Sequence, residues 1–219
     1  MARPRRIQTP GLLRHVVARG NGRMKIFLDE GDYRQFVHLL GEICEQFALE
    51  CWSYCVMPNH YHAALRPELP NISEAMRHLN SRYAQWWNWR HARVGHTFQG
   101  RFKDQIVQHD VYLLALLRYI ALNPVRAGLV EAPAAWSWGS YPALAGSRPA
   151  PPFLCGTKVL GVFGEADPGV LSERYVKFVL AERPEDAALA DRLHSNERIL
   201  GDVAFKEAIQ TKGEAVAGV

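Results

Sequence analysis

With 219 residues, the chain is long enough for one ordinary domain with an appendage or for two small domains, and 48% of its residues are hydrophobic, which suffices for a packed core. No stretch approaches the roughly 20 apolar residues that a membrane-spanning helix needs, and residues 1–10 lack the apolar centre of a signal peptide. Four cysteines without a CxxC pair indicate reduced thiols rather than a disulfide scaffold. These features argue against membrane-spanning helices and predict a soluble, cytoplasmic protein.

The net charge of +4 is unevenly distributed along the chain. Residues 1–126 carry a net charge of +7 and residues 127–219 a net charge of −3, and the first 28 residues contain seven basic side chains and no acidic one. This asymmetry favours a polyanionic partner for the first part of the chain, although many ordinary domains also carry a basic face.

The apolar periodicity predicts alternating strands and helices over the first 123 residues. The predicted elements are, in chain order, a strand at 12–19, a helix at 30–47, strands at 51–57 and 60–66, a helix beginning at Asn71, a strand at about 101–108 and a helix ending at about Asn123. Pro124 disfavours continuation of the last helix. The order predicts an α+β fold: a ferredoxin-like βαββαβ antiparallel sheet with helices on one face, an added helix and a helical C-terminal tail.

The signals weaken after this first region. Prolines mark residues 146–169 as a linker, and residues 170–219 have the pattern of short helices. We therefore expect a sheet domain at residues 1–145, a Pro-rich linker at 146–169 and a small helical C-terminal region at 170–219, to which the sequence assigns no role.

The segment His60-Tyr61-His62 lies on one of the predicted strands. Alternate side chains of a strand share a face, so His60 and His62 point to one side and Tyr61 points to the other, toward the helices. Two imidazoles at such positions can hold one metal ion through nitrogen. A pair of ordinary surface histidines is the alternative that so short a pattern leaves open.

The last predicted helix presents Tyr112, Tyr119 and Asn123 within about 40° of one another, beside an apolar face of leucines. Asn123 could offer its amide oxygen to a metal, and Tyr119 could offer its phenol oxygen as a nucleophile. The alternative is an amphipathic helix whose tyrosine borders the core.

Basic and aromatic residues gather on the helix that begins at Asn71 and around the strand that follows it. Positive grooves with stacking aromatic rings bind single-stranded nucleic acid. The candidate contacts to such a strand are Arg19, Asn21, Arg77, Arg82, Arg101 and Lys103. A solvated basic face over a tryptophan-rich core explains the pattern equally well.

Four segments together are specific for a known family. They are, in order, HVVARGN at 15–21, VMPNHYH at 56–62, GHTFQGRFK at 95–103 and YIALNPVRAGL at 119–129. Over about residues 10–145 the chain resembles the REP-associated tyrosine transposases, which are relatives of the smallest insertion-sequence transposases of the single-tyrosine, His-hydrophobic-His (HUH) type. The resemblance implies that residues 1–145 form a catalytic domain with the ferredoxin-like sheet.

The resemblance also implies a metal-dependent DNA strand transferase. Tyr119 corresponds to the catalytic tyrosine, with Tyr112 as second choice, and His60, His62 and Asn123 correspond to the ligands of Mg²⁺ or Mn²⁺. Such enzymes cut single-stranded DNA beside hairpins of palindromic repeats through a 5′-phosphotyrosine intermediate. The implied partner is therefore hairpin DNA in the nucleoid, bound by a monomer or a homodimer.

Three other functions compete with this interpretation. A domesticated DNA-binding protein without catalysis would need no nucleophile. A metal hydrolase that activates water would form no covalent bond to DNA. A structural zinc site is poorly supported, because no cysteine lies at zinc-ligand spacing from the histidine pair.

Overall fold

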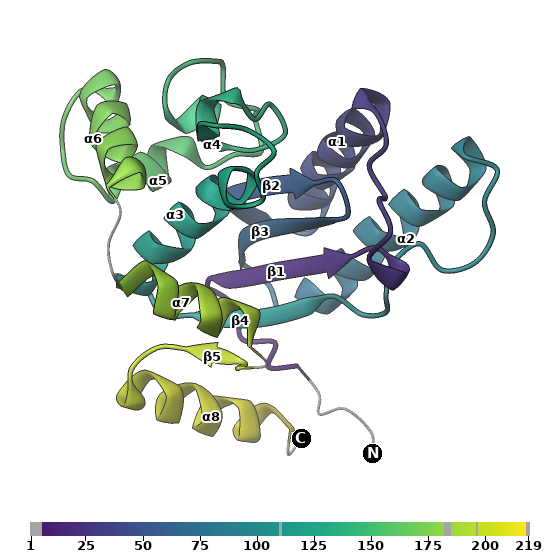
Figure 1. Ribbon diagram of the computed structural model, residues 1–219. Coiled ribbons are helices and arrows are strands. Elements are labelled where there is room, and N and C mark those ends of the chain that lie inside the picture. Colours follow the sequence, from purple (N-terminus) through teal and green to yellow (C-terminus); the bar gives the residue numbers. More distant parts are fainter. Residues whose placement is uncertain (1–5, 110, 182–184, 196, 218–219) are drawn as a thin grey trace.

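A five-stranded sheet in the order β2-β3-β1-β4-β5 forms the centre of the computed structural model, which describes residues 6–109, 111–181, 185–195 and 197–217 (Figure 1). The strands are β1 (Arg14–Arg19), β2 (Leu49–Met57), β3 (His60–Pro67), β4 (Lys103–Val107) and β5 (Ile199–Leu200). The first four strands pair antiparallel, and β5 joins β4 in parallel. This order is that of a ferredoxin-like βαββαβ sheet, so the predicted fold class is confirmed.

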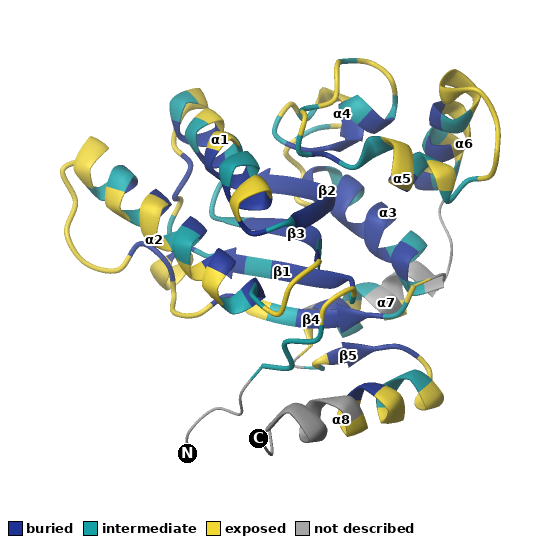
Figure 2. Ribbon diagram, turned by 180° about the vertical axis from the view of Figure 1, so that it is seen from behind, coloured by how far each residue is buried: buried dark blue, intermediate teal, exposed yellow. Residues whose placement is uncertain are grey.

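Helices cover both faces of the sheet. The helices are α1 (Glu30–Gln46), α2 (Ile72–Arg90), α3 (Val111–Arg126), α4 (Tyr141–Leu144), α5 (Gly156–Gly161), α6 (Pro168–Leu180), α7 (Glu185–His194) and α8 (Val203–Ala217), with 3₁₀ turns at Asn21–Arg23 and Pro133–Ala135. The Tyr61 hydroxyl donates to Asn80 of α2 at 2.8 Å, whereas the next side chain, His62, packs against Tyr119 of α3. Because neighbouring residues of a strand face opposite ways, α1 and α2 lie on one face and α3 on the other (Figures 1 and 2).

The end of α3 differs from the prediction. The helix continues past Pro124 to Arg126, so the expected end at Asn123 was wrong by one turn. The turn closes because the Ala127 amide donates to the Asn123 carbonyl at 3.0 Å, and Gly128 then ends it with a positive φ of 66°. The extra turn brings Arg126 onto the helix, seven residues after Tyr119 and therefore on the same side.

Later parts of the chain cover both edges of the sheet. Segment 136–155 pairs with the outer edge of β2, where the Val56 amide donates to the Trp138 carbonyl and the Cys155 amide to the Cys51 carbonyl, both at 2.8 Å. On the opposite edge β5 pairs with the end of β4, and α8 follows it (Figure 1). Edge strands are thereby shielded from pairing with other chains.

The expected linker at 146–169 contains α5, and its Leu154 and Val159 are buried in the same core as the sheet. The described residues after 170 form most of α6, then α7, β5 and α8, so the region expected to be helical also contributes a short strand to the sheet. The division into domains at 145 and 169 stays a prediction. Within the described ranges, no helix combines the length and the apolar character needed to cross a bilayer.

Candidate active site

Tyr119 lies in an aromatic cluster with two histidines of the sheet. Its ring meets His62 edge-on at a centroid distance of 5.4 Å and His15 at 5.8 Å, while the two imidazoles stack on each other at 5.1 Å. The cluster forms because His15 and His62 occupy adjacent antiparallel strands, with His62 opposite Val17 in the register, and α3 crosses above them. All three side chains belong to one chain, so tyrosine and histidines meet without a partner subunit.

His60 and His62 face the same side of β3, as their spacing predicts. Their ring centroids are 4.9 Å apart and the rings are nearly perpendicular. The Nδ1 atom of His60 is 2.6 Å from the Asn59 side-chain oxygen, and the Nδ1 atom of His62 is 2.8 Å from Nε2 of His15. Both Nδ1 atoms are engaged within the protein, so Nε2 is the nitrogen of each ring that fits a metal ion.

Asn123 and Arg126 follow Tyr119 along α3. The Asn123 side-chain amide donates to the Tyr119 carbonyl at 3.1 Å, and the Arg126 guanidinium lies 5.6 Å from the centre of the Tyr119 ring. Burial raises the pKa of the Tyr119 phenol, whereas the side-chain hydrogen bond with Asn123 and the charges of Arg126 and Arg19 lower that pKa. Tyr119 is only 3% exposed, so little of its side chain is open to a phosphodiester in this conformation.

The donor set suits a hard divalent cation with open positions. In the described part of the chain, no group of three or more His, Cys, Asp or Glu side chains is arranged to hold a metal ion. Two imidazole nitrogens and one amide oxygen, completed by water and phosphate oxygens, are compatible with Mg²⁺ or Mn²⁺. A closed structural zinc site would require four protein ligands, and the Cys55 thiol instead contacts the Met57 sulfur at 3.7 Å.

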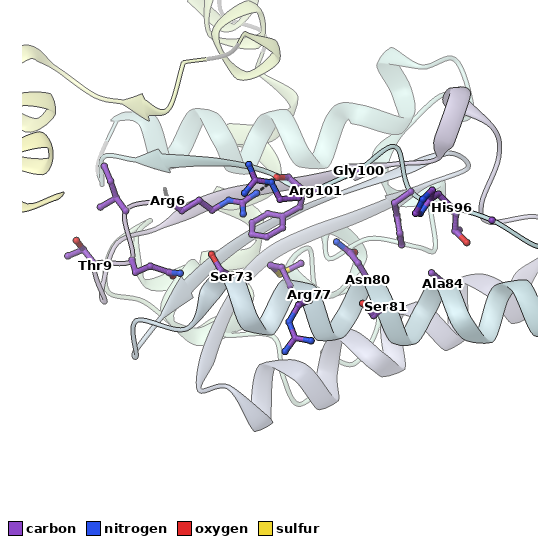
Figure 3. A pocket seen from close by; sticks show the side chains of 17 residues that line it. Arg6, Thr9, Ser73, Arg77, Asn80, Ser81, Ala84, His96, Gly100 and Arg101 are labelled. Carbon is purple, nitrogen blue, oxygen red and sulfur yellow. Dashed lines mark hydrogen bonds between the residues drawn. The ribbon is translucent and has the colours of Figure 1, made fainter. Parts of the chain in front are cut away.

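Two of the six predicted DNA contacts, Arg77 and Arg101, line one cavity of about 940 Å³ (Figure 3). Arg77 and Ser81 come from α2, and Arg6 and Arg101 come from the segments opposite it. The Arg6 guanidinium lies 3.7 Å from the centre of the Phe102 ring. Positive charge and an aromatic wall therefore occur together on the α2 side of the sheet.

Arg82 does not join this cavity. It stands five residues after Arg77, which corresponds to about 140° around a helix. Its guanidinium instead pairs with Glu42 of α1 at 2.8 Å. If Arg82 contacts DNA as predicted, it does so on a different surface of α2 from Arg77.

Arg19 and Lys103 lie on the Tyr119 side of the sheet. Arg19 shares a strand face with His15, and Lys103 is opposite Val17, which is on that same face. Asn21 is exposed in the turn after β1, where its amide donates to the Thr97 carbonyl at 2.9 Å. The predicted DNA contacts thus divide between the two faces, with Asn21 at the end of the sheet.

Tyr112, the second choice for a nucleophile, has a different environment. Its hydroxyl accepts a hydrogen bond from Arg192 at 3.1 Å, and the Arg192 guanidinium lies 5.1 Å from its ring centre. This arrangement gives Tyr112 a role in holding α7 and supports Tyr119 as the first choice.

Sequence reasoning missed three residues around the site. His15 and Asn59 lie within the quoted segments HVVARGN and VMPNHYH but received no role, and Arg126 lies beyond the expected end of its helix. The signal available for Arg126 was its spacing of seven residues from Tyr119, which is two helical turns. The hydrogen bond between His15 and His62 depends on the register of β1 against β3, which no local sequence pattern indicates.

Known proteins resemble this chain at the level of family, sequence and fold. The family of IS200-like transposases matches residues 9–123. A protein of Haemophilus influenzae named as a REP-associated tyrosine transposase is 27% identical over 122 residues, which are 50% of this chain and 69% of that protein. The solved structure of a REP-associated tyrosine transposase bound to a REP hairpin has a TM-score of 0.58 at 18% identity, covering 70% of this chain and 90% of the other.

Proposed function

This chain belongs to the IS200-like transposase family, and we propose that it cleaves and rejoins single-stranded DNA through a covalent bond between Tyr119 and a 5′ phosphate. The observation that carries the proposal is the position of Tyr119, whose ring lies 5.4 Å from that of His62, one member of the His60–His62 pair. A phenol beside two potential metal ligands supplies a nucleophile and a site for the phosphate in one place.

The proposed reaction is a transesterification. The Tyr119 oxygen attacks the phosphorus and loses its proton to water, while the bond between phosphorus and the 3′ oxygen breaks. The 3′ oxygen leaves and takes up a proton, which gives a free 3′-hydroxyl and a 5′-phosphotyrosine. The number of phosphoester bonds is unchanged, so a second 3′-hydroxyl can reverse the step and join strands.

His60 and His62, through Nε2, and Asn123, through its amide oxygen, would hold Mg²⁺ or Mn²⁺. A bound divalent ion supplies positive charge that offsets the charge of a non-bridging phosphate oxygen. The protein supplies positive charge to the phenol as well, since the Arg126 and Arg19 side chains lower the Tyr119 pKa against the effect of burial. Burial outweighs these charges and keeps the pKa of Tyr119 above its ordinary value, so a proton acceptor such as water is needed for the attack.

We propose that the cavity lined by Arg77 and Arg101 binds part of a DNA hairpin, as suggested by the hairpin-bound relative. The cavity and Tyr119 lie on opposite faces of the sheet, so the cleaved strand would pass around the start of β4, where Lys103 is exposed. Phosphate contacts of this kind make affinity depend on salt.

Exchange of Arg101 for alanine tests the hairpin cavity. Loss of one phosphate contact is expected to reduce the slope of log affinity against log salt concentration by about 1, which fluorescence anisotropy with a labelled hairpin measures. Arg34→Ala is the matched control, because Arg34 lies on α1 and pairs only with a neighbouring residue of its own helix among the contacts of the described chain. Equal slopes for both variants would remove Arg101 from the interface.

The catalytic proposal is tested on a denaturing gel with end-labelled hairpin DNA and Mn²⁺. The wild type is expected to give a covalent protein–DNA band, and Tyr119→Phe and His60→Ala are expected to give none. Tyr112→Phe is the matched control and should retain the band. A band that persists in Tyr119→Phe contradicts the assignment of the nucleophile.

A DNA-binding protein without catalysis is the second candidate, and the 3% exposure of Tyr119 favours it. A non-catalytic DNA-binding protein would bind the hairpin tightly and give no covalent band in any variant. A water-activating metal hydrolase would instead release cut DNA free of protein. The same gel separates all three outcomes.

A monomer can carry the complete site, because α3 lies over its own sheet, and a dimer would then serve DNA binding.

A further inference from the structure

We propose that His15 and Gln105 are positioning residues that hold His62 in the tautomer with its proton on Nδ1 and its lone pair on Nε2. The proposal rests on the proposed function to the extent that His62 is taken as a metal ligand. It also gives the C-terminal region a role, because that region fixes Gln105.

The amide of Gln105 on β4 has an orientation that its hydrogen bonds determine. Its Nε2 donates to two backbone carbonyls, that of Arg192 at 3.0 Å and that of Glu197 at 2.9 Å. Only the nitrogen of an amide side chain can donate, so these two acceptors determine which end of the amide faces them. The Gln105 oxygen is consequently the atom directed at Nδ1 of His15, at 3.1 Å.

The orientation of Gln105 determines which nitrogens of His15 and His62 carry protons. The Gln105 oxygen has no proton, so Nδ1 of His15 is the donor. A neutral imidazole has one donor and one acceptor nitrogen, so Nε2 of His15 accepts, and its partner at 2.8 Å, Nδ1 of His62, must donate. His15 is only 1% exposed, a location in which a charged ring carries a desolvation cost. The lone pair of neutral His62 therefore lies on Nε2.

His60 reaches the same tautomer through separate contacts. The Asn59 amide nitrogen donates to the Arg23 carbonyl at 3.1 Å, so the Asn59 oxygen is the acceptor for Nδ1 of His60 at 2.6 Å. Both members of the histidine pair thus carry their proton on Nδ1. A metal site that binds through Nε2 requires the proton of each histidine to be on Nδ1. Two separate hydrogen-bond networks provide this for His60 and His62.

The outer end of the network lies in the C-terminal region. Arg192 belongs to α7, and Glu197 lies in the turn between α7 and β5. Their side chains form an ion pair at 3.0 Å, and Lys206 of α8 joins it at 2.7 Å. The ion pairs hold the turn so that both carbonyls face Gln105, and residues far beyond the sheet domain thereby orient His62.

The test uses the full chain without DNA. Nitrogen NMR of the imidazole rings reports which nitrogen is protonated, and titration with Mn²⁺ followed by electron paramagnetic resonance reports metal affinity. His15→Phe keeps the ring stacking but removes the acceptor; His15→Gln restores an acceptor oxygen. Gln105→Leu removes the outer contact, and His38→Phe, at an exposed position of α1, is the matched control. Thermal melting verifies that each variant is folded.

We expect His15→Phe to weaken Mn²⁺ binding roughly 10–100-fold and to shift the His62 proton toward Nε2. His15→Gln and His38→Phe should keep the wild-type tautomer and nearly wild-type affinity, and Gln105→Leu should give mixed tautomers. An unchanged His62 tautomer in folded His15→Phe overturns the proposal, as does a wild type with its His62 proton on Nε2. The NMR result stands even if the wild type never forms a covalent bond to DNA, so failure of the proposed function is distinguishable from failure of this network.

Discussion

The ion pair between Arg14 and Asp104 is a buried contact on which stability depends. Arg14 is fully buried on β1, and its guanidinium donates to the Asp104 carboxylate of β4 at 2.8 Å; the Asp104 side chain is 6% exposed. Arg6 approaches the same carboxylate at 3.8 Å and also lines the hairpin cavity. Exchange of Asp104 for alanine would leave the Arg14 charge buried without its carboxylate.

Removal of one partner of a buried pair costs about 3–5 kcal/mol, because the other charge keeps its desolvation cost. For a chain of 219 residues, this corresponds to a fall of roughly 6–20 °C in Tm. The magnitude is set by the low exposure of both groups. The exposed pair of Arg34 and Glu30, at 71% and 69% side-chain exposure, is expected to contribute at most about 0.5 kcal/mol.

Urea denaturation at neutral pH measures the free energy of unfolding of three variants. Asp104→Ala should lose about 3–5 kcal/mol, Arg34→Ala should change little, and the double variant Arg14→Met with Asp104→Leu should regain most of the loss, since packed apolar side chains can replace a buried pair. A loss below about 1 kcal/mol in Asp104→Ala would refute the reasoning, because that is the range of a solvent-screened pair.

Two further predictions concern pH and a close backbone contact. The hydrogen bond from Arg192 lowers the pKa of Glu197 to about 2 from an ordinary value of 4.5, so its stabilising contribution is present above pH 4.5 and is lost as the pH falls toward 2. Urea titrations from pH 7 to pH 3 should therefore show a steeper loss in the wild type than in Glu197→Gln, and parallel curves would contradict this. Gly20→Ala should destabilise by about 1–3 kcal/mol, because its Cβ would lie 2.3 Å from the Met24 carbonyl oxygen. Gly161→Ala, at a position on α5 with open space around it, should be neutral or stabilising. Thermal melts measure the stability of both variants, and equal effects at the two glycines would contradict the steric argument.

The first four strands of the sheet and the first three helices were predictable because their apolar patterns are long. The alternation around His60 and His62 indicated which face the pair occupies, and the helical spacing placed Tyr119 and Asn123 together. β5 was not predictable, since Ile199–Leu200 is too short to show a period. Its position comes from pairing with β4, a contact between residues more than 90 positions apart.

The missing parts of the site have a common cause. The bond between His15 and His62 joins residues 47 positions apart, and it exists only because β1 and β3 pair in one register. The helix end at Asn123 was predicted because the residue before a proline is disfavoured in a helix. That rule does not take into account the hydrogen bond from the Ala127 amide to the Asn123 carbonyl, which closes one more helical turn after Pro124. Arg77 and Arg82 were grouped by charge, whereas the helix separates them by direction.

The most direct measurement is to identify the residue that bears the DNA. The protein is incubated with single-stranded hairpin DNA and Mn²⁺, the DNA is digested with nuclease, and the protein is cleaved into peptides for mass spectrometry. We predict a nucleotide 5′-phosphate on Tyr119 alone, in a peptide that also contains Asn123. A nucleotide on Tyr112 or on any other residue, or cleaved DNA with no modified peptide, would contradict it.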